Sequence, residues 1–486
     1  MNRIFAQGTR LVDELGRERI FNGINYVDKS DYTEGEQKYP ELNETIIKKL
    51  SDLGFNLIRL GFTWAKLEPK PGEYNNEYLD SVENIIDLCE KYGIYVFLDM
   101  HQDLFTPQIT WGDGAPKWAV FTDGTKIRPT HFVWAEQYFW GKACHRAFDN
   151  FWNNLHYKGK GLQDWYADCW KHIAKRFGDK EAVIGFDMLN EPFPGTPGGK
   201  CFRKLVGGAA KTILFDKEVN RIQLVKDAIS KDRVEKVLGH ITYPVLHKAT
   251  SGCDELIEQF DKNRYNPFIR KISAAIREVN TDKLLFLENS YYSNMGIPYS
   301  ASPIEINGKR DPQQLFAPHA YDLMVDTPEY KYASDERVGG IFGEHRKSQE
   351  KLGMPVIVGE WGGFGGSEDY SWLRHIIFLV NLFDSNKWSS TYWHYMDCHF
   401  DSPLMDVLSR PYPFAIDGEI ESYGYDFEKK VFNISFNQTQ DGESIICTPS
   451  AVKSLTVDGE KIEYKTDGVK TAIKTSAGNH TVVVIF

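Results

Sequence analysis

The sequence predicts an α/β fold, namely a (β/α)8 TIM barrel followed by a small antiparallel β-sandwich. Over most of the 486 residues, short apolar runs alternate with longer amphipathic runs, which is typical of parallel βα units. Eight such apolar runs occur, and eight strands close a barrel of this kind. After them come short β-branched runs separated by turn residues, without helical periodicity, which indicates a separate antiparallel domain.

The eight strand candidates follow one another with helix-period segments between them. A first helix is predicted at Leu42–Leu53, a second at Tyr78–Tyr92, which ends before Gly93, and another at Leu162–Phe177, which ends before Gly178. The strand candidates are Phe21–Tyr26, Asn56–Phe62, Ile94–Met100, Val183–Leu189, Lys283–Glu288, Leu315–Tyr321, Pro355–Glu360 and Thr391–Tyr395.

A doubly wound parallel sheet is the alternative architecture. Sheets of that kind that bind nucleotides carry a G-x-G-x-x-G sequence after the first strand, or a Walker sequence, and this chain has neither. The sequence therefore favours the barrel.

The pattern changes at about Asp417. Two Asp-Gly pairs, at Asp441 and Asp458, are typical of hairpin turns. We expect a structural β-sandwich packed on the barrel, with residues 1–410 forming the barrel domain and residues 411–486 the sandwich. The strand candidates are Phe432–Asn437, Glu443–Thr448, Ser454–Val457, Lys461–Tyr464, Thr471–Lys474 and Thr481–Phe486.

Two long insertions interrupt the barrel, at about 101–160 and 193–254. The first is rich in Trp and Phe, and the second carries many Gly and Pro residues. Both follow the carboxyl ends of strands, which is the face where barrel enzymes keep their active sites. Loops of this length are uncommon unless they are functional or disordered, and the aromatic content argues against disorder.

The composition excludes several classes of function. Hydrophobic residues make up 42% of the chain and charged residues 26%, as in an ordinary soluble globular protein. The formal net charge of −11 argues against a nucleic-acid partner and against firm electrostatic binding to anionic lipid, because both need clustered Lys and Arg. A transient contact with lipid surfaces or micelles through a neutral amphiphilic substrate stays compatible with this charge.

The seven cysteines are scattered along the chain, and no CxxC pair or His/Cys cluster indicates zinc. We therefore expect buried free thiols and neither a metal nor a cofactor. No apolar run reaches the roughly 18 residues that span a bilayer. The N-terminus lacks the apolar region of a secretion signal, which predicts a cytoplasmic protein, or a secreted one if a signal has been removed.

Two glutamates at strand ends carry the predicted chemistry. Glu191 lies in LNEP after the fourth strand, and Glu360 lies in VIVGEWGG at the end of the seventh. Hydrolysis of a glycoside with retention of configuration requires two carboxyl groups about 5–5.5 Å apart, one as the acid and one as the nucleophile. Facing strand ends of a barrel supply such a pair, so we expect a glycosidase site.

Other polar side chains lie at the same predicted edge of the barrel. Arg59 sits inside an apolar strand, where an unpaired cation is costly, so we expect it to pair with a carboxylate, and Glu360 is the candidate partner. Asn190 can bind the sugar 2-hydroxyl, and Trp393 offers a flat face for a pyranose ring. The other candidates at strand ends are His101, Asp103, His319 and Tyr321.

These residues resemble glycoside hydrolase family 5 of clan A. The resemblance extends over roughly residues 20–400 and implies that Glu191 is the acid/base and Glu360 the nucleophile. It also implies that five residues orient them: Arg59, His101, Asn190, His319 and Tyr321. The matching features are Asn190-Glu191-Pro192, Glu360 before Trp361-Gly362, Arg59 within its strand, His319-x-Tyr321 and Trp393.

Within that family, three features are similar to endoglycoceramidases and related glucosylceramidases: DMHQD at Asp99–Asp103, GDGAPKWA at Gly112–Ala119 and the C-terminal sandwich. This resemblance implies a substrate in which a glycan or glucose is linked to ceramide. It also implies that Lys29 and Asp103 contact the sugar next to the scissile bond.

A ceramide leaving group requires an apolar groove beside the acid/base, since burying each methylene contributes about 0.8 kcal/mol. We expect the aromatic part of the first insertion and the Gly-rich segment after Pro192 to build this groove. Its candidate residues are Trp111, Trp118 and Phe121.

Three alternatives remain. A steryl or small-molecule β-glucosidase would close the sugar side to a single unit. An endo-β-glucanase or mannanase would have an open cleft lined by exposed Trp, without lids. A non-catalytic glycan-binding protein would usually have lost one of the two glutamates. A phosphate-binding barrel is disfavoured because no glycine-rich loop follows the last two strands.

Overall fold

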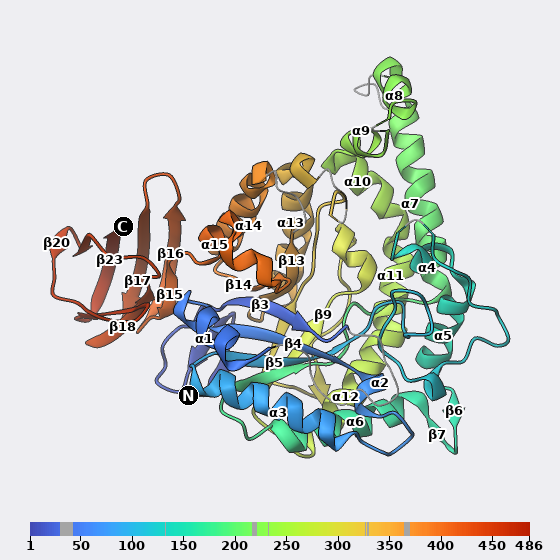
Figure 1. Ribbon diagram of the computed structural model, residues 1–486, viewed down its shortest axis with the longest axis horizontal. Helices are drawn as coiled ribbons and strands as arrows, with labels where there is room; N and C mark the ends of the chain where they lie inside the picture. Colours follow the sequence, from blue (N-terminus) through green and yellow to red (C-terminus); the bar gives the residue numbers. More distant parts are fainter. Residues whose placement is uncertain are drawn as a thin grey trace.

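The computed structural model describes residues 1–29, 42–131, 133–215, 221–231, 233–325, 327, 330–363 and 370–486. A closed barrel of eight parallel strands lies at its centre, which confirms the predicted fold class (Figure 1). The sheet order is β12-β9-β8-β5-β4-β3-β14-β13, and parallel bridges Phe316–Val356 and His319–Glu360 close the ring. The strands are β3 Asn22–Val27, β4 Leu57–Thr63, β5 Tyr95–His101, β8 Val183–Asp187, β9 Leu284–Glu288, β12 Gln314–Ala317, β13 Ile357–Gly362 and β14 Ser389–Trp393.

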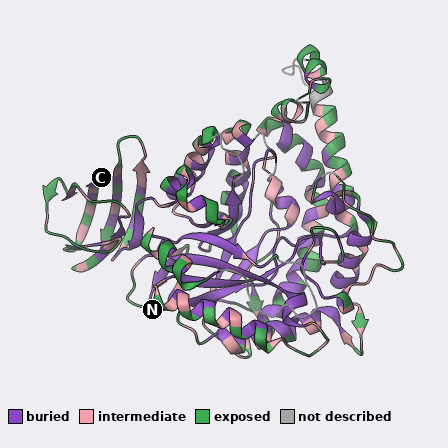
Figure 2. Ribbon diagram, in the orientation of Figure 1, coloured by how far each residue is buried: buried purple, intermediate pink, exposed green. Residues whose placement is uncertain are grey.

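The barrel strands are buried on both faces, as expected where helices cover a parallel sheet (Figure 2). The helix predicted at Leu162–Phe177 has these same bounds in the structure. The helices outside the barrel are α1 Glu44–Asp52, α2 Trp64–Leu67, α3 Asn76–Lys91, α6 Leu162–Phe177, α11 Asp254–Phe260, α12 Asn266–Arg277, α13 Asp335–Leu352, α14 Leu373–Asn386 and α15 Pro403–Leu408.

An N-terminal hairpin packs on the barrel core at the amino ends of the strands. Its strands are β1 Ile4–Gln7 and β2 Arg10–Asp13. Ile4 and Leu11 share a buried cluster with residues near the strand starts, including Leu57, Tyr95 and Leu284. This end is closed by apolar packing, so the opposite, carboxyl end of the strands is the one available for chemistry.

The first insertion forms a compact aromatic layer around α4 Glu136–Trp140 and α5 Lys142–Trp152, and then a small hairpin of β6 His156–Tyr157 and β7 Lys160–Gly161. Its aromatic rings pack on one another. The ring centroid of Tyr138, for example, lies 6.2 Å from that of Phe148 in α5, and 4.5 Å from those of Phe193 and Tyr291 in neighbouring segments.

The second insertion is mainly helical, which differs from the Gly- and Pro-rich loop that its composition indicated. Its helices are α7 Thr196–Phe215, α8 Arg221–Ala228, α9 Arg233–Gly239 and α10 Tyr243–Thr250. The glycines fit a helix here because two helices cross closely: a Cβ atom on Gly208 would lie 3.0 Å from the Cα atom of Ala249 in α10. Tertiary packing thus outweighs the low helix propensity of glycine.

The C-terminal region forms two antiparallel sheets, as predicted, with orders β15-β18-β22-β21 and β16-β17-β23-β19-β20. The strand predicted at Lys461–Tyr464 is wrong, because the chain crosses from one sheet to the other there. The strands are β15 Tyr412–Ala415, β16 Glu419–Asp426, β17 Val431–Gln438, β18 Gly442–Cys447, β19 Ser454–Val457, β20 Glu460–Lys461, β21 Lys465–Asp467, β22 Lys470–Thr475 and β23 Gly478–Ile485.

Six of the seven cysteines are buried and all are free, as expected, and only Cys398 is exposed. Among the described residues, no helix is both long enough and apolar enough to cross a bilayer.

Candidate active site

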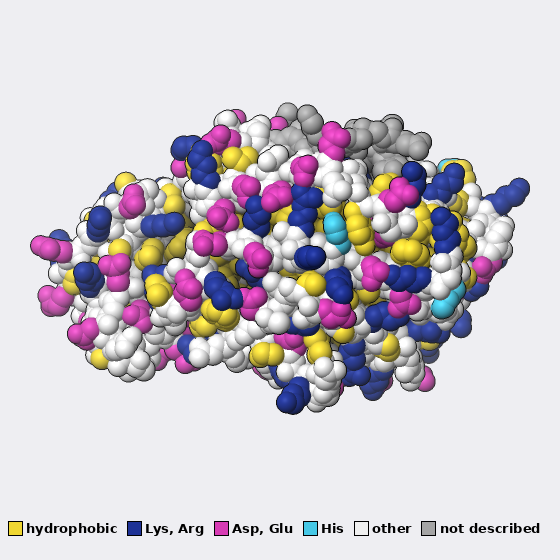
Figure 3. All heavy atoms as spheres, turned by 90° about the horizontal axis from the view of Figure 1, so that it is seen from below, with side chains coloured by type: hydrophobic (Ala, Val, Ile, Leu, Met, Phe, Trp, Pro, Cys, Tyr) yellow, Lys and Arg dark blue, Asp and Glu magenta, His cyan; other side chains and the backbone are white. Residues whose placement is uncertain are grey.

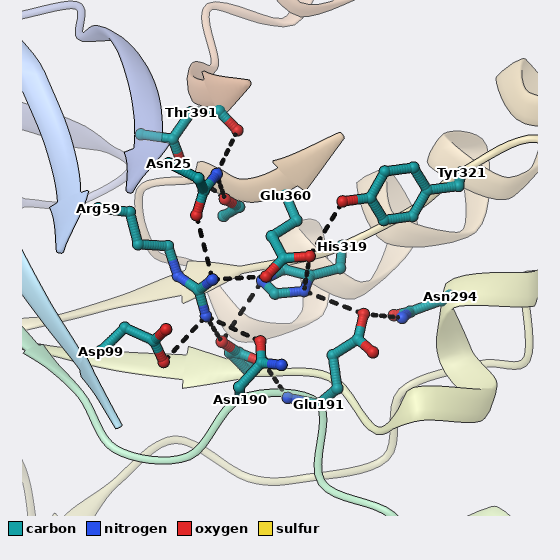
Figure 4. Close-up of polar contacts among 12 residues, drawn as sticks. Asn25, Arg59, Asp99, Asn190, Glu191, Asn294, His319, Tyr321, Glu360 and Thr391 are labelled. Atoms are coloured by element: carbon teal, nitrogen blue, oxygen red, sulfur yellow. Dashed lines mark hydrogen bonds and ion pairs between the residues drawn. The ribbon is translucent and has the colours of Figure 1, made fainter. Parts of the chain in front are cut away.

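Polar side chains from all eight barrel strands, or from the residues just after them, converge at the carboxyl end of the barrel (Figure 4). Glu360 lies within β13, and Glu191 lies four residues beyond the end of β8. One carboxylate oxygen of each, and one ring nitrogen of His319, all lie within 4.8 Å of one another. The structure therefore brings together the two glutamates that the sequence singled out.

Glu360 is held by two donors. Arg59 Nη1 donates to Glu360 Oε1 at 2.6 Å, which confirms the predicted partner of this buried arginine. The Tyr321 hydroxyl donates to Glu360 Oε2 at 2.9 Å. The two donors fix the position of both carboxylate oxygens of Glu360, the predicted nucleophile.

Glu191 sits on a left-handed backbone, with φ of 42°. Its backbone N–H donates to Glu288 Oε2 at 2.7 Å, and its carbonyl oxygen accepts from the Gln102 amide at 3.2 Å. Its side chain accepts a 2.6 Å hydrogen bond from Asn294 Nδ2, in the short 3-10 helix η4 (Tyr291–Met295). An uncommon conformation of this kind persists only where surrounding contacts hold it.

His319 lies between three carboxylates. Its Nδ1 atom is 3.2 Å from Glu191 Oε1 and 3.8 Å from Glu360 Oε2, and its Nε2 atom is 3.4 Å from Glu288 Oε1. Burial alone lowers the pKa of His319, but the Glu288 and Glu360 carboxylates outweigh it and raise this pKa well above its usual range. The carboxylates around His319 therefore favour the protonated form of its imidazole.

Burial raises the pKa of the Glu191 carboxyl above its ordinary value. The hydrogen bond with His319 opposes this rise, and repulsion by Glu360 adds to it. The pKa of Glu191 is therefore shifted in the direction that a general acid requires.

Arg59 is fully buried among four carboxylates. Besides Glu360, it contacts Asp187 at 3.0 Å, Glu288 at 2.8 Å and Asp99 at 3.1 Å. Its Nη2 atom also donates to the side-chain oxygen of Asn190 at 2.9 Å. The guanidinium thus fixes the strand ends that carry both glutamates.

A second polar group lies next to this pair. Lys29 forms an ion pair with Asp103, and its Nζ atom lies 4.5 Å from the ring centroid of Trp393. His101 stacks on Trp393 at 5.5 Å and contacts Asp99 at 2.8 Å. Burial alone lowers the pKa of His101, but Asp99 outweighs it and raises this pKa to about 10. Charged side chains and the flat ring of Trp393 thus lie side by side, a combination suited to binding a sugar ring.

Two clusters outside the glutamate pair have the composition of metal sites. They are Asp99–Asp187–Glu288 and His101–Asp103–Asp113. A protein cation already lies against each, because Arg59 pairs with the first cluster and Lys29 with the second. Within the described residues, these cations supply the charge that a metal ion would otherwise provide.

The three groove candidates are not equivalent. Trp118 packs against Trp64 at 5.2 Å and donates from Nε1 to the Glu68 carbonyl at 3.0 Å. Phe121 packs against Tyr157 at 5.6 Å. Trp111 is 60% exposed and lies two residues before Asp113, whose carboxylate accepts from the Asp103 backbone. Trp111 therefore lies at the rim of the site, whereas the other two lie in the packing of the insertion.

Several site residues were not predicted, namely Asn25, Asp187, Glu288 and Asn294. Asp187 and Glu288 are acidic residues ending apolar strands, so the argument used for Arg59 would have found them: a buried charge requires a partner. Asn294 lies in an irregular segment that brings it to Glu191 only in the folded chain.

The fold and the site define a glycoside hydrolase, and the chain belongs to glycosyl hydrolase family 5. The family model described as cellulase (glycosyl hydrolase family 5) matches residues 22–398. A model of the glycoside hydrolase family 5 C-terminal domain matches residues 410–485.

Among curated relatives, an endoglycoceramidase of Cyanea nozakii is 38% identical over 210 residues, which covers 38% of this chain and 41% of that protein. A glucosylceramidase of Rhizopus delemar is 28% identical over 210 residues, covering 37% of this chain and 31% of the relative. The matched part of the chain thus spans about two fifths or less of these relatives' length.

Solved structures show the same fold over the whole chain. Endo-glycoceramidase II from Rhodococcus sp., in complex with a five-membered iminocyclitol, aligns with a TM-score of 0.75 at 23% identity and covers 99% of both chains. The lactosyl-enzyme intermediate of that protein aligns with a TM-score of 0.72 at 22% identity, again over 99% of both chains.

Proposed function

We propose that the protein is a retaining β-glycosidase that cleaves the bond between a glycan or glucose and a ceramide. The observation that carries this proposal is the approach of the Glu191 and Glu360 carboxylates to within 4.8 Å across the barrel mouth. Retaining enzymes keep their two carboxyl groups about 5–5.5 Å apart, whereas inverting enzymes keep them farther apart to admit a water.

In the first step, a Glu360 oxygen bonds to the anomeric carbon while the bond to the leaving oxygen breaks. Glu191 donates its proton to that oxygen, so the aglycone departs as a neutral alcohol. In the second step, a water molecule gives a proton to Glu191. The oxygen of this water bonds to the anomeric carbon as the bond from that carbon to Glu360 breaks. Arg59 and Tyr321 stabilise the Glu360 carboxylate as it leaves.

The sugar on the Glu360 side of the scissile bond is proposed to bind to five residues: Asn190, His101, Lys29, Asp103 and Trp393. Their charged groups and the Trp393 ring suit hydroxyls and a pyranose face, respectively. The relatives named as acting on ceramide glycosides support a lipid aglycone on the Glu191 side. Trp111, exposed at the rim beyond Asp113, is the groove candidate that the geometry supports best.

A substrate panel tests the function directly. Glucosylceramide, a ganglioside, a steryl glucoside, an aryl glucoside and carboxymethylcellulose are each incubated with the protein, and products are identified. We expect turnover of a ceramide glycoside and release of the β-anomer first, as seen by NMR of early product. An initial α-anomer would mean inversion, and turnover of the polysaccharide alone would make the protein a glucanase.

Two variants test the roles of the glutamates. Glu360→Gln should lower turnover by about 10³-fold or more, because the substitution removes the carboxylate that forms the covalent intermediate. Glu191→Ala should spare the first step with activated aryl glycosides, and added azide should partly restore the second. Substantial activity in the Glu360 variant would contradict the assignment.

A further inference from the structure

The second insertion forms a helical arm that stands clear of the barrel (Figure 1). Helix α7 leaves the loop that carries Glu191 and runs to α8 at the tip, and its 20 residues span about 30 Å. At its base, the arm is anchored beside the site, since the Tyr292 hydroxyl donates to the Gly198 carbonyl at 2.6 Å. The base of α7 thus belongs to the active-site region, while α8 lies far from it.

Helix α8 buries a polar residue and exposes apolar ones, the opposite of an ordinary surface helix. Its buried residue is Asp227, which accepts from Gln223 at 2.8 Å and contacts His240, just after α9, at 2.9 Å. Three aliphatic residues are exposed instead: Ile222 by 72%, Val225 by 61% and Ile229, just past the helix end, by 81%.

These aliphatic side chains share one face. At about 100° per residue, Ile222, Val225 and Ile229 all lie roughly opposite Asp227 around the helix axis. A surface helix ordinarily turns its apolar stripe toward the core and its polar side toward water. Here Asp227 contacts His240, just after α9, whereas the aliphatic residues are exposed, and the tip of the arm is largely coloured as exposed in Figure 2. An exposed apolar face of this kind indicates an interaction surface.

The charge of the arm differs in sign from that of the rest of the chain. Residues 193–254 contain eleven Lys and Arg against six Asp and Glu, a net charge of +5. The chain as a whole has a net charge of −11, so the residues outside the arm carry −16. Arg221, Lys226 and Lys231 are exposed around the apolar stripe. On the side of the molecule opposite the arm, acidic and basic side chains are interspersed instead (Figure 3).

We propose that the tip of the arm, formed by Ile222, Val225 and Ile229 with Arg221, Lys226 and Lys231, docks on an anionic lipid bilayer. Exposed aliphatic side chains ringed by basic residues insert into the headgroup boundary while the cations bind anionic headgroups. The net charge of the whole chain argues against such binding, but the basic residues are segregated on the arm. The inference rests on the proposed function, because docking would bring the site to bilayer-held glycolipid.

Vesicle sedimentation tests the docking without reference to catalysis. The full chain should pellet with phosphatidylcholine vesicles that contain phosphatidylserine, bind pure phosphatidylcholine more weakly, and be released by salt. Ile222→Ser/Val225→Ser/Ile229→Ser should lower the binding at least tenfold. Arg221→Gln/Lys226→Gln/Lys231→Gln should lower it by about fivefold per residue and remove the salt dependence. Leu15→Ser, at an equally exposed site far from the arm, and Lys461→Gln are the controls and should leave binding unchanged.

Activity assays separate the two proposals. Both arm variants should cleave aryl glycoside and detergent-solubilised glycolipid at the wild-type rate but lose turnover of vesicle-embedded glycolipid. Wild type that cleaves glycolipid in detergent but ignores vesicles overturns the docking and leaves the proposed function standing. A protein that binds vesicles but cleaves no glycoside overturns the function instead. Concentration-dependent dimers that disappear in the serine variant, with no vesicle binding, would make the tip a self-association surface and overturn the docking.

Discussion

At the scale of single residues, Glu288 connects the two halves of the site. One carboxylate oxygen accepts from the Glu191 backbone at 2.7 Å, and the other contacts Arg59 at 2.8 Å and His319 at 3.4 Å. Glu288 acts through the Glu191 backbone, Arg59 and His319, so it is a positioning residue. Through it, the left-handed backbone at Glu191 is tied to the cations that surround Glu360.

Glu288→Gln keeps the size of the side chain and one acceptor for Glu191 but removes the charge. We expect kcat to fall by about 10²-fold with little change in KM, because small displacements of a catalytic group have effects of this size. The pKa of His319 should also fall, since Glu288 is the largest influence that raises it. Steady-state kinetics and imidazole titration by NMR measure both. Glu278→Gln, at an exposed ion pair with Lys171, is the control. Unchanged His319 titration would contradict the positioning role.

The pH dependence follows from Glu191. Burial and Glu360 raise its pKa above 4.5, so activity should fall as the pH rises through this raised value and the general acid loses its proton. In Glu360→Gln the repelling charge is absent, the carboxylate form of Glu191 becomes more favourable, and its pKa should decrease. Titration of the Glu191 carboxyl by ¹³C NMR in both proteins measures the difference. A higher pKa in the variant would show that repulsion by Glu360 does not act on Glu191.

At the scale of elements, the first insertion is an aromatic layer rather than a flexible lid. Trp118 packs on Trp64 of α2, and its indole N–H bonds to a backbone carbonyl. Trp111, in contrast, is mostly exposed at the rim. We therefore expect Trp118 to contribute to stability and Trp111 to turnover of the lipid substrate.

Trp118→Ala should lower the free energy of unfolding by about 2 to 4 kcal/mol, because a partly buried indole and its contacts are lost. Its kcat/KM should fall equally for lipid and aryl glycosides. Trp111→Ala should change stability by less than about 0.5 kcal/mol and lower turnover of the lipid substrate alone. Thermal unfolding and kinetics on both substrates measure these effects. A selective loss of lipid turnover in Trp118→Ala would instead make that residue part of the groove.

At the scale of the whole molecule, the C-terminal sheets pack on the amino end of the barrel. The Tyr412 hydroxyl donates to the Gly54 carbonyl at 2.7 Å, and Arg19 Nε donates to the Phe414 carbonyl at 2.7 Å. Ile20, just before β3, belongs to the apolar core of these sheets. We infer that residues 411–486 are a structural domain, because they share buried side chains with the barrel on the side away from the site.

A chain ending at residue 410 should aggregate, because it would expose Ile20 and remove the hydrogen-bond partners of Arg19 Nε and the Gly54 carbonyl. Expression with size-exclusion chromatography and aryl glycoside kinetics is the measurement. A monodisperse truncated protein with unchanged kinetics but weaker binding to glycan or lipid surfaces would make the region an accessory binding module instead.

The sequence by itself determined the barrel, its eight strands and the two glutamates. These features follow from local patterns: apolar runs bounded by turns, and charged residues that end or interrupt such runs. Arg59 is the clearest case, because a cation in an apolar strand requires a carboxylate, and Glu360 is the partner that the structure shows.

Only the tertiary structure decided how the site is supported and what the insertions do. Asn294 reaches Glu191 across 103 positions of sequence, and Glu288 reaches the backbone of Glu191 across 97, contacts that depend on barrel closure and not on any local pattern. The second insertion is helical despite its glycines because α7 packs closely on α10. Local propensity is worth at most about 1 kcal/mol at each glycine, and the burial of a helix face outweighs it.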